Sequence, residues 1–251
     1  PVLYGNFDTR GNAGGGGPPA TWDAFFDMAR RLTAQDTAGK TVRYGVAFWD
    51  ITWPFLSMIW SEGGELTDRS YENITLNDPV VVGVMTRVQG LVEEGYAIVP
   101  SKASGGHRAA FASGRAAMIL DSPAVYSEMA EDIEGFTVVA APYPAGRAGR
   151  VYAPGGGGLA MTAATPPEKR DAAWQFMKFL LSPESLAYFA EESGYLAFTG
   201  RSRDALGEIP EERLALYKAL DHVRADFSVN MSPAVRNSFD WAFQSIVIDG
   251  A

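Results

Sequence analysis

Four consecutive glycines at positions 155–158 leave a stretch of main chain with no side-chain cover. Glycine is favoured where another group approaches the backbone closely or where φ is positive. The apolar residues 159–161 come next and predict a buried strand. Thr165 and Glu168 have the spacing of a capping box, which predicts a helix over 166–181 with a buried apolar stripe. Such a segment is typical of a ligand-facing crossover between two lobes, and a surface loop before an ordinary strand fits these residues equally well.

Strand and helix signals alternate along the rest of the chain, which predicts an α/β sandwich. Thr21 has the form of an N-cap, and Asp78-Pro79 and Ser182-Pro183 have the form of helix starts. The predicted helices cover 21–32, 54–61, 79–94, 106–113, 183–192, 211–223 and 233–248, with another starting at 121–123, and the predicted strands cover 1–7, 42–48, 116–120 and 136–140. Trp22, Trp60 and Trp174 lie on apolar helix stripes and are assigned to the core.

Charge and composition narrow the class of protein. With 21 basic and 30 acidic residues the formal net charge is −9, which argues against a nucleic-acid surface because such surfaces are normally basic. The 251 residues, 47% hydrophobic and 20% charged, are enough for one large or two smaller domains. No run approaches the length of a spanning helix, and the first residues lack the form of a signal peptide, so for an exported protein we expect the targeting segment to lie outside this sequence.

The sequence lacks the residue patterns of common catalytic centres. Without cysteine, it has no disulfide, thiolate nucleophile or cysteine-ligated metal. His107 and His222 are far apart, and each is interpreted as a surface or helix-end residue. There is no phosphate loop, HExxH or GxSxG motif, and the glycine run lacks the spacing of a dinucleotide site. We therefore expect no cofactor, no metal and no catalytic residue.

Aromatic residues between elements are the candidates for binding. Trp49 and Trp53 flank a predicted strand-to-helix junction, and Tyr195 follows a glycine at a helix break. Exposed aromatic faces suit stacking on sugar rings or on alkyl-ammonium groups. Each of the two tryptophans is equally well explained as a core aromatic.

Several short motifs occur in a fixed order along the chain. They are Leu3-Tyr4, Thr21-Trp22-Asp23-Ala24-Phe25, Phe111-Ala112-Ser113-Gly114-Arg115-Ala116-Ala117-Met118, Gly155-Gly156 with Leu159, Ala173-Trp174-Gln175-Phe176, Ser182-Pro183-Glu184 and Gly194-Tyr195-Leu196. In this combination the chain resembles the extracellular solute-binding proteins of bacterial ABC importers, in the carbohydrate-binding family that includes glycerol-3-phosphate and glycerophosphodiester binders. Each motif alone is loose, but the ordered set is specific for that family.

The resemblance implies a set of ligand-binding residues. The stretch Asn230-Met231-Ser232-Pro233-Ala234-Val235-Arg236 is similar to one in the glycerophospho-compound branch that ends in a ligand-binding arginine. By that likeness Arg236 would bind the phosphate or hydroxyls, Ser122 would hydrogen-bond the ligand, and Tyr195 would be the ligand-binding tyrosine. Gly155 and Gly156 would offer the backbone, and Trp53 and Trp49 would form a tryptophan wall. The alternative for Arg236 is a salt bridge on a helix surface.

The resemblance also implies the architecture and the partners. We expect a two-lobe periplasmic-binding-protein fold of type II, incomplete in lobe 1, with residues 1–152 in lobe 2, 153–190 in lobe 1, and 191–251 as the hinge return and the C-terminal helical part of lobe 2. Relatives have about a hundred further residues before Pro1 and a further helix after Ala251. The expected partners are a small polar solute and the transmembrane subunits of a permease, for a monomeric periplasmic or extracellular protein held at the membrane through the transporter or a lipid anchor.

Two other functions stay open at the level of the sequence. A glycoside- or phosphodiester-cleaving enzyme on an α/β scaffold would need a carboxylate pair or a metal site beside Trp53 and Tyr195. A protein-interaction module would show a large exposed apolar patch and no cleft.

Overall fold

The computed structural model describes residues 1–7, 17–68, 70, 73–101, 106–126, 128–129, 133, 135–209, 211–224 and 233–248, and the side chains of 211–212, 215 and 233–236 lie outside this description. A central sheet of five strands has the order β5-β4-β6-β1-β7. The strands are β1 (Val2–Gly5), β4 (Val46–Ala47), β5 (Ala97–Ile98), β6 (Met118–Asp121) and β7 (Val139–Ala141). A separate hairpin pairs β2 (Ala34–Gln35) with β3 (Thr41–Arg43).

The sheet is mixed, and its parallel part positions the site. β4 runs parallel to both β5 and β6, with Ala47 opposite Ile119. β1 runs antiparallel to β6 and to β7. The carboxyl ends of β4 and β6 therefore lie at the same edge of the sheet, so the residues that follow these two strands are neighbours.

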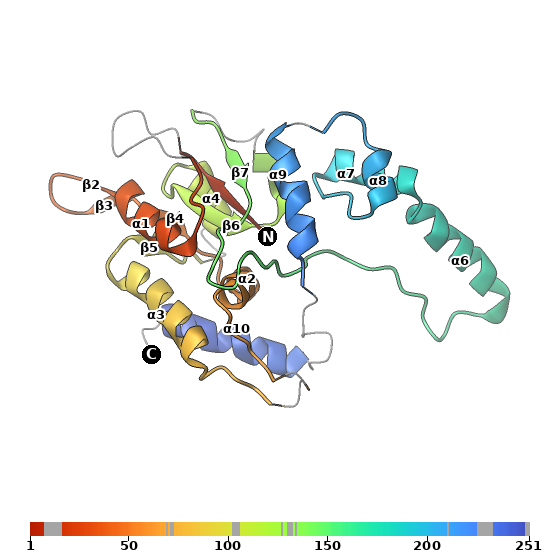
Figure 1. Ribbon diagram of the computed structural model, residues 1–251, viewed down its shortest axis with the longest axis horizontal. Coiled ribbons are helices and arrows are strands. Elements are labelled where there is room, and N and C mark those ends of the chain that lie inside the picture. The colour runs from red at the N-terminus through yellow and green to blue at the C-terminus, as the bar shows by residue number, and fades with distance from the viewer. Residues whose placement is uncertain are drawn as a thin grey trace.

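Helices cover both faces of the sheet (Figure 1). Alternate residues of β1 point to opposite faces: Leu3 packs in a large apolar cluster, whereas Val2 and Tyr4 pack in a smaller one. The large cluster is formed with α1 (Trp22–Leu32), α2 (Trp53–Ser61), α3 (Pro79–Glu93) and α10 (Pro233–Val247). The smaller cluster is formed with α4 (Gly106–Ala112), the 3-10 turn η2 (Pro123–Val125) and α9 (Glu211–Ala219), which continues into the turn η3 (Leu220–His222). This is the α/β sandwich that the alternating signals predict.

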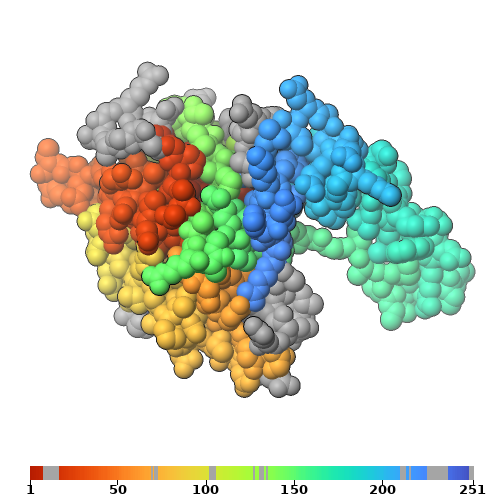
Figure 2. Space-filling model, in the orientation of Figure 1, coloured from red at the N-terminus to blue at the C-terminus, as the bar shows by residue number. Residues whose placement is uncertain are grey.

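A segment of the chain projects away from this body. Figures 1 and 2 show α6 (Pro167–Leu180), α7 (Pro183–Ser193) and α8 (Gly200–Asp204) beside the sheet domain, joined to it by an extended stretch before α6. No residue of α6 is buried. Its aromatic side chains face solvent, with Trp174 52%, Phe176 60% and Phe179 64% exposed. A helix with this much exposed apolar surface has a face that packs on nothing in the described chain.

Most helix starts predicted from caps are confirmed. Thr21 accepts a hydrogen bond from the backbone N–H of Ala24 at 3.2 Å, and Asp78 accepts one from Val80 at 2.8 Å. Ser182 caps α7 through the N–H of Ser185 at 3.2 Å. Trp22 and Trp60 are buried, as assigned. These caps are local hydrogen bonds, which explains why sequence spacing alone locates them.

Several predictions around the glycine run are wrong. Residues 159–161 form no strand and Leu159 is 47% exposed, because none of the five strands of the sheet runs beside them. The helix α6 exists, but its N-cap is Pro166 and no side chain caps it. With the start one residue later, Glu168 is not at the capping-box position, and Thr165 contacts the hydroxyl of Thr162 instead. The core assignment of Trp174 is also wrong, because α6 lies outside the core.

Two further elements differ from their predicted form. The strand expected over 42–48 is divided into β3 and β4, since Tyr44 forms only an isolated bridge and Gly45 packs directly against the backbone of Ala29. The helix expected from 121–123 begins as the short η2 turn, whose N-cap is Ser122.

Candidate binding site at the carboxyl edge of the sheet

The residues after β4 and β6 meet at one edge of the sheet. Trp49 follows β4 by two residues, and Ser122 follows β6 directly. In open α/β sheets, ligands bind in the crevice outside the carboxyl ends of the strands. This edge is therefore where the fold itself favours a binding site.

Trp49, Trp53 and the glycine run come together there. The two indole rings lie 6.3 Å apart at an interplanar angle of 78°, so they form two walls of a corner. The Nε1 of Trp53 donates a hydrogen bond of 2.8 Å to the carbonyl oxygen of Pro154. A Cβ added to Gly155 would lie 2.9 Å from Cζ2 of Trp53, so glycine permits the close approach of this backbone to the indole. Both tryptophans are half-buried and so are neither pure core residues nor fully exposed.

Helix α10 holds the loop that presents the two tryptophans. Asp240 accepts a hydrogen bond of 2.7 Å from the backbone N–H of Thr52, the residue before α2. Gln244 donates one of 2.9 Å to the carbonyl of Asp50. Because these two residues lie one helical turn apart on α10, they fix the loop 49–53 from the same side.

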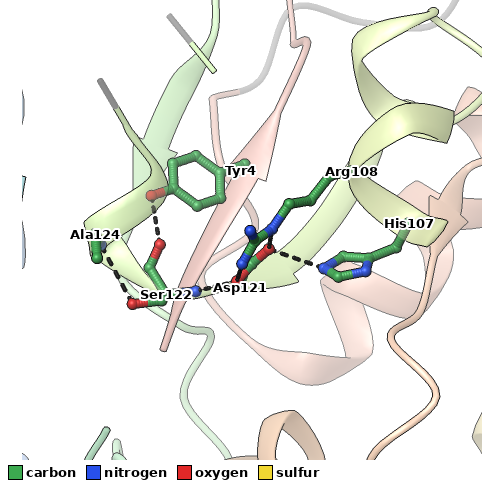
Figure 3. Close-up of polar contacts among 6 residues, drawn as sticks. All are labelled: Tyr4, His107, Arg108, Asp121, Ser122 and Ala124. Carbon is green, nitrogen blue, oxygen red and sulfur yellow. Dashed lines mark hydrogen bonds and ion pairs between the residues drawn. The ribbon is translucent and has the colours of Figure 1, made fainter. Parts of the chain in front are cut away.

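A buried carboxylate organises the polar side of the site (Figure 3). Asp121, fully buried at the end of β6, accepts hydrogen bonds from Arg108 Nε at 2.6 Å, Arg108 Nη2 at 3.0 Å and the backbone N–H of Ser122 at 2.6 Å. Nε2 of His107 lies 2.8 Å from its Oδ2. Burial alone would raise the pKa of Asp121, but hydrogen bonds from His107 and Arg108 outweigh it and hold that pKa below its ordinary value.

His107 and Arg108, which bond to Asp121, also contact Trp49. The imidazole of His107 stacks on the indole with 5.1 Å between ring centroids and 21° between planes. The guanidinium carbon of Arg108 lies 5.8 Å from the indole centroid. Thus the aromatic wall and the carboxylate network are parts of one arrangement.

Ser122 lies at the start of η2, within this network. Its Oγ accepts the backbone N–H of Ala124 at 3.2 Å, and its carbonyl accepts the hydroxyl of Tyr4 at 2.8 Å. Burial raises the pKa of Tyr4, so the phenol stays protonated and keeps donating to Ser122. The Oγ of Ser122 therefore acts as the cap of η2, and its hydroxyl proton makes no hydrogen bond to the residues that the structure describes.

For Tyr195, Gly156 and Arg236, the other three predicted residues, the described part of the structure gives no contact with Trp49 or Trp53. Tyr195 is 37% exposed, and its ring centroid lies 5.4 Å from that of Phe189. Arg213 donates a hydrogen bond of 3.1 Å to the carbonyl of Tyr195. Gly156 has a positive φ of 129°. Arg236 lies on α10, and its side chain is outside the described residues. The structure therefore brings Trp49, Trp53 and Gly155 together and links Ser122 to Trp49 through Asp121, His107 and Arg108, while the ligand-binding roles of all seven predicted residues stay predictions.

Sequence reasoning missed the polar network. His107 was expected at a surface or a helix end; it lies at the start of α4, but it is buried, so the surface interpretation is wrong. Arg108 and Asp121 gave no signal, since no spacing rule links the first turn of α4 to the end of β6. The one local hint is that Asp121 directly precedes Ser122 at the end of an apolar strand.

Other features of the described residues set limits on the chemistry. Within the described ranges, no three His, Asp or Glu side chains are grouped to hold a metal ion. The same ranges contain no helix long and apolar enough to cross a membrane.

A hollow of about 250 Å³ lies between α2, α3 and α10, but it is lined mainly by side chains such as Phe55, Met85 and Phe243. That lining offers a polar solute few hydrogen bonds, so the edge with Trp49 and Ser122 is the better site.

Solved structures match this fold over the whole chain. UgpB from Mycobacterium tuberculosis, in complex with glycerophosphocholine, has a TM-score of 0.83 and 25% identity, covering 100% of this chain and 63% of that one. The GacH receptor of Streptomyces glaucescens, solved unliganded and with acarbose, has a TM-score of 0.78 and 21% identity, covering 100% and 64%. Maltose-bound MalE3 of T. maritima has a TM-score of 0.77 and 22% identity, covering 100% and 66%.

These likenesses confirm the two-lobe periplasmic-binding-protein fold of type II. The chain spans 63–66% of the length of the three matched structures. A search of the curated proteins found no match. The profile of the family described as bacterial extracellular solute-binding protein matches residues 4–187, well over half of the chain. By its motifs, its fold and this match, the chain belongs to the bacterial extracellular solute-binding proteins.

Proposed function

We propose that the whole protein is the substrate-binding component of an ABC importer, which captures a sugar or a glycerophospho-compound between two lobes and delivers it to a membrane permease. The observation that carries this proposal is the corner of Trp49 and Trp53 against the backbone at Gly155, at the carboxyl edge of the sheet. Aromatic faces stack on sugar rings and on alkyl-ammonium groups, and an open backbone adds directional hydrogen bonds.

The chemistry of the site supports binding without bond cleavage. A hydrolase of the kind considered above needs a carboxylate free to act as acid, base or nucleophile. Asp121 is instead fully buried and engaged by both Arg108 and His107. The matched family is described as solute-binding, which supports binding as the role of this site.

A glycerophosphodiester is the ligand class that we favour. The support is the likeness to UgpB, whose structure contains glycerophosphocholine, at 25% identity. In this proposal Arg236 binds the phosphate, because a guanidinium offers a planar fork of donors to such oxygens. The sugar alternative retains the tryptophan corner and Ser122, and directs Arg236 to vicinal hydroxyls.

The projecting segment supports one part of a lobe assignment that otherwise rests on the family likeness. We assign residues 1–152 to lobe 2, 153–190 to lobe 1, and 191–251 to the hinge return and the C-terminal part of lobe 2. The exposed aromatic side chains of α6 support this, because a lobe 1 core would cover them. Closure of the lobes over the ligand would be a hinge motion about the two places where the chain passes between them, near residues 152–153 and 190–191. The protein would act as a monomer outside the cytoplasmic membrane, held near it by the transporter or a lipid anchor.

The test is ligand binding by the protein with both lobes complete. Thermal shift and titration calorimetry against maltose, glycerol-3-phosphate and glycerophosphocholine should identify a ligand. Trp53→Ala should lower the affinity for that ligand. The 251-residue chain alone should bind weakly, since closure needs both lobes. Turnover of a chromogenic glycoside or phosphodiester, without a measurable stable complex, would instead support the enzyme alternative.

A further inference from the structure

We propose that Asp121 is a positioning residue of this site: from its buried place at the end of β6 it holds His107 and Arg108 against Trp49, so that the indole wall is fixed before ligand arrives. The inference rests on the proposed function in so far as Trp49 faces the ligand. Neither the sequence motifs nor the family likeness implies a role for Asp121, His107 or Arg108.

The geometry joins these four side chains without a break. Asp121 Oδ2 is 2.8 Å from Nε2 of His107 and 2.6 Å from Nε of Arg108. On its other side the imidazole is stacked nearly parallel to the Trp49 indole, at 5.1 Å and 21°. One carboxylate therefore sets the plane of the imidazole, and the imidazole in turn sets the plane of the indole.

Burial and charge explain why a carboxylate is needed at this position. His107 is 5% exposed and Asp121 is fully buried, so neither can exchange its partner for water at low cost. The guanidinium of Arg108 makes two hydrogen bonds to the carboxylate and remains partly exposed, with its side chain 39% accessible. Both partners lie on consecutive residues of α4, and Asp121 thus fixes the first turn of that helix relative to the end of β6.

Such a network matters for affinity because a free indole must otherwise be ordered when the ligand binds. Ordering one flexible side chain reduces affinity by roughly three- to tenfold, and pre-positioning avoids that loss. Trp49 is stacked on His107 at 5.1 Å and is in T-shaped contact with Trp53 at 6.3 Å. The remaining freedom of the ring is then small, which is the condition for a pre-organised aromatic wall.

The first test needs no ligand. In protein labelled with 5-fluorotryptophan, the fluorine resonance of Trp49 is the one that disappears in Trp49→Phe. Asp121→Asn and His107→Ala should each shift and broaden this resonance and leave those of Trp22 and Trp60 in place. Asp78→Asn is the matched control, because it removes a carboxylate that caps α3 away from Trp49. If Asp121→Asn does not fold, His107→Ala decides.

A double substitution separates positioning from general stability. In a His107→Phe background the ring can still stack on Trp49 but no longer bonds to Asp121, so Asp121→Asn should move the Trp49 resonance much less than in the wild type. A Trp49 resonance that keeps its wild-type position and width in Asp121→Asn would overturn the inference, even if this variant unfolds more easily. Where Asp121→Asn does not fold, the same result in His107→Ala would overturn it.

The second test uses the two-lobe protein with glycerophosphocholine and maltose as probes. Asp121→Asn and His107→Ala should weaken the binding of whichever probe binds by roughly three- to tenfold. A moved resonance with unchanged affinity would overturn the role of the network in ligand binding. If the wild type binds neither probe while the resonance moves as expected, the proposed ligand class is wrong and the positioning of Trp49 by Asp121 stands.

Discussion

The Nε1 of Trp53 donates its hydrogen bond to the carbonyl of Pro154 at 2.8 Å, across about a hundred residues of sequence. This bond connects the first residue of α2 to the start of the glycine run, where the chain leaves the sheet domain toward α6. The next residue, Gly155, passes so close to the indole that a side chain would collide with it. The exit of the chain and the aromatic wall are therefore fixed by the same contact.

The first prediction concerns this contact. Gly155→Ala should weaken ligand binding by the two-lobe protein at least tenfold, because the new Cβ would lie 2.9 Å from Cζ2 of Trp53 and must displace either the indole or the backbone. Gly157→Ala is the control, since a Cβ there meets nothing within 4 Å. Calorimetry with the same ligand measures both. Equal affinity of the two variants would show that the packing at Gly155 does not matter for the site.

The second prediction compares two glycines of the sheet domain. A Cβ on Gly45 would lie 1.8 Å from the backbone oxygen of Ala29, so Gly45→Ala should lower the free energy of unfolding by at least about 2 kcal/mol, because α1 must move away from the sheet. Gly83 is exposed within α3 and has open space around its Cα. There alanine should raise the free energy of unfolding by about 0.5–1 kcal/mol through helix propensity. Urea unfolding measures both, and effects of the same sign would contradict the packing described for Gly45.

Local signals explain what the sequence could predict. The helix starts at Thr21, Asp78 and Ser182 depend on a side chain bonding a backbone N–H two or three residues on, and all three are found. The likeness of ordered motifs similarly led to the fold, which the structural matches confirm. Trp49 and Trp53 are candidates by their position at a predicted strand-to-helix junction, and Gly155 by the glycine run. The likeness places all three at one ligand site, and the structure brings these residues together.

Long-range contacts explain what the sequence alone could not predict. Leu159 and Trp174 have the character of core residues, yet they are exposed because nothing in the described chain packs on them. Conversely, His107 looks like a surface residue until β6 brings Asp121 to it, from 14 positions further along the chain. Apolar or polar character gives the preference of a residue for an environment, whereas tertiary pairing decides whether that environment is present.

The third prediction concerns acid. The pKa of Asp121 is below its ordinary value of 3.8, since the hydrogen bonds from His107 and Arg108 outweigh the effect of burial. The carboxylate therefore contributes stability that is fully present above pH 3.8 and is lost as the pH falls from there through the folded-state pKa. The difference in unfolding free energy between wild type and Asp121→Asn should be largest near neutral pH and should shrink below that value. Urea unfolding at a series of pH values measures it, and a difference independent of pH would contradict the ionised network.

The last prediction concerns the projecting segment. Phe179 is 64% exposed on α6, whereas Phe111 is fully buried beneath the sheet. In the 251-residue chain, Phe179→Ala should change the free energy of unfolding by no more than about 0.5 kcal/mol, while Phe111→Ala should lower it by about 3–5 kcal/mol. Phe179→Ala should also reduce the binding of an apolar fluorescent dye, because it removes exposed aromatic surface. In the two-lobe protein the same substitution should become clearly destabilising if lobe 1 covers α6. An equally small effect in both proteins would show that α6 is exposed in the complete protein as well, and would remove the main support for placing residues 153–190 in lobe 1.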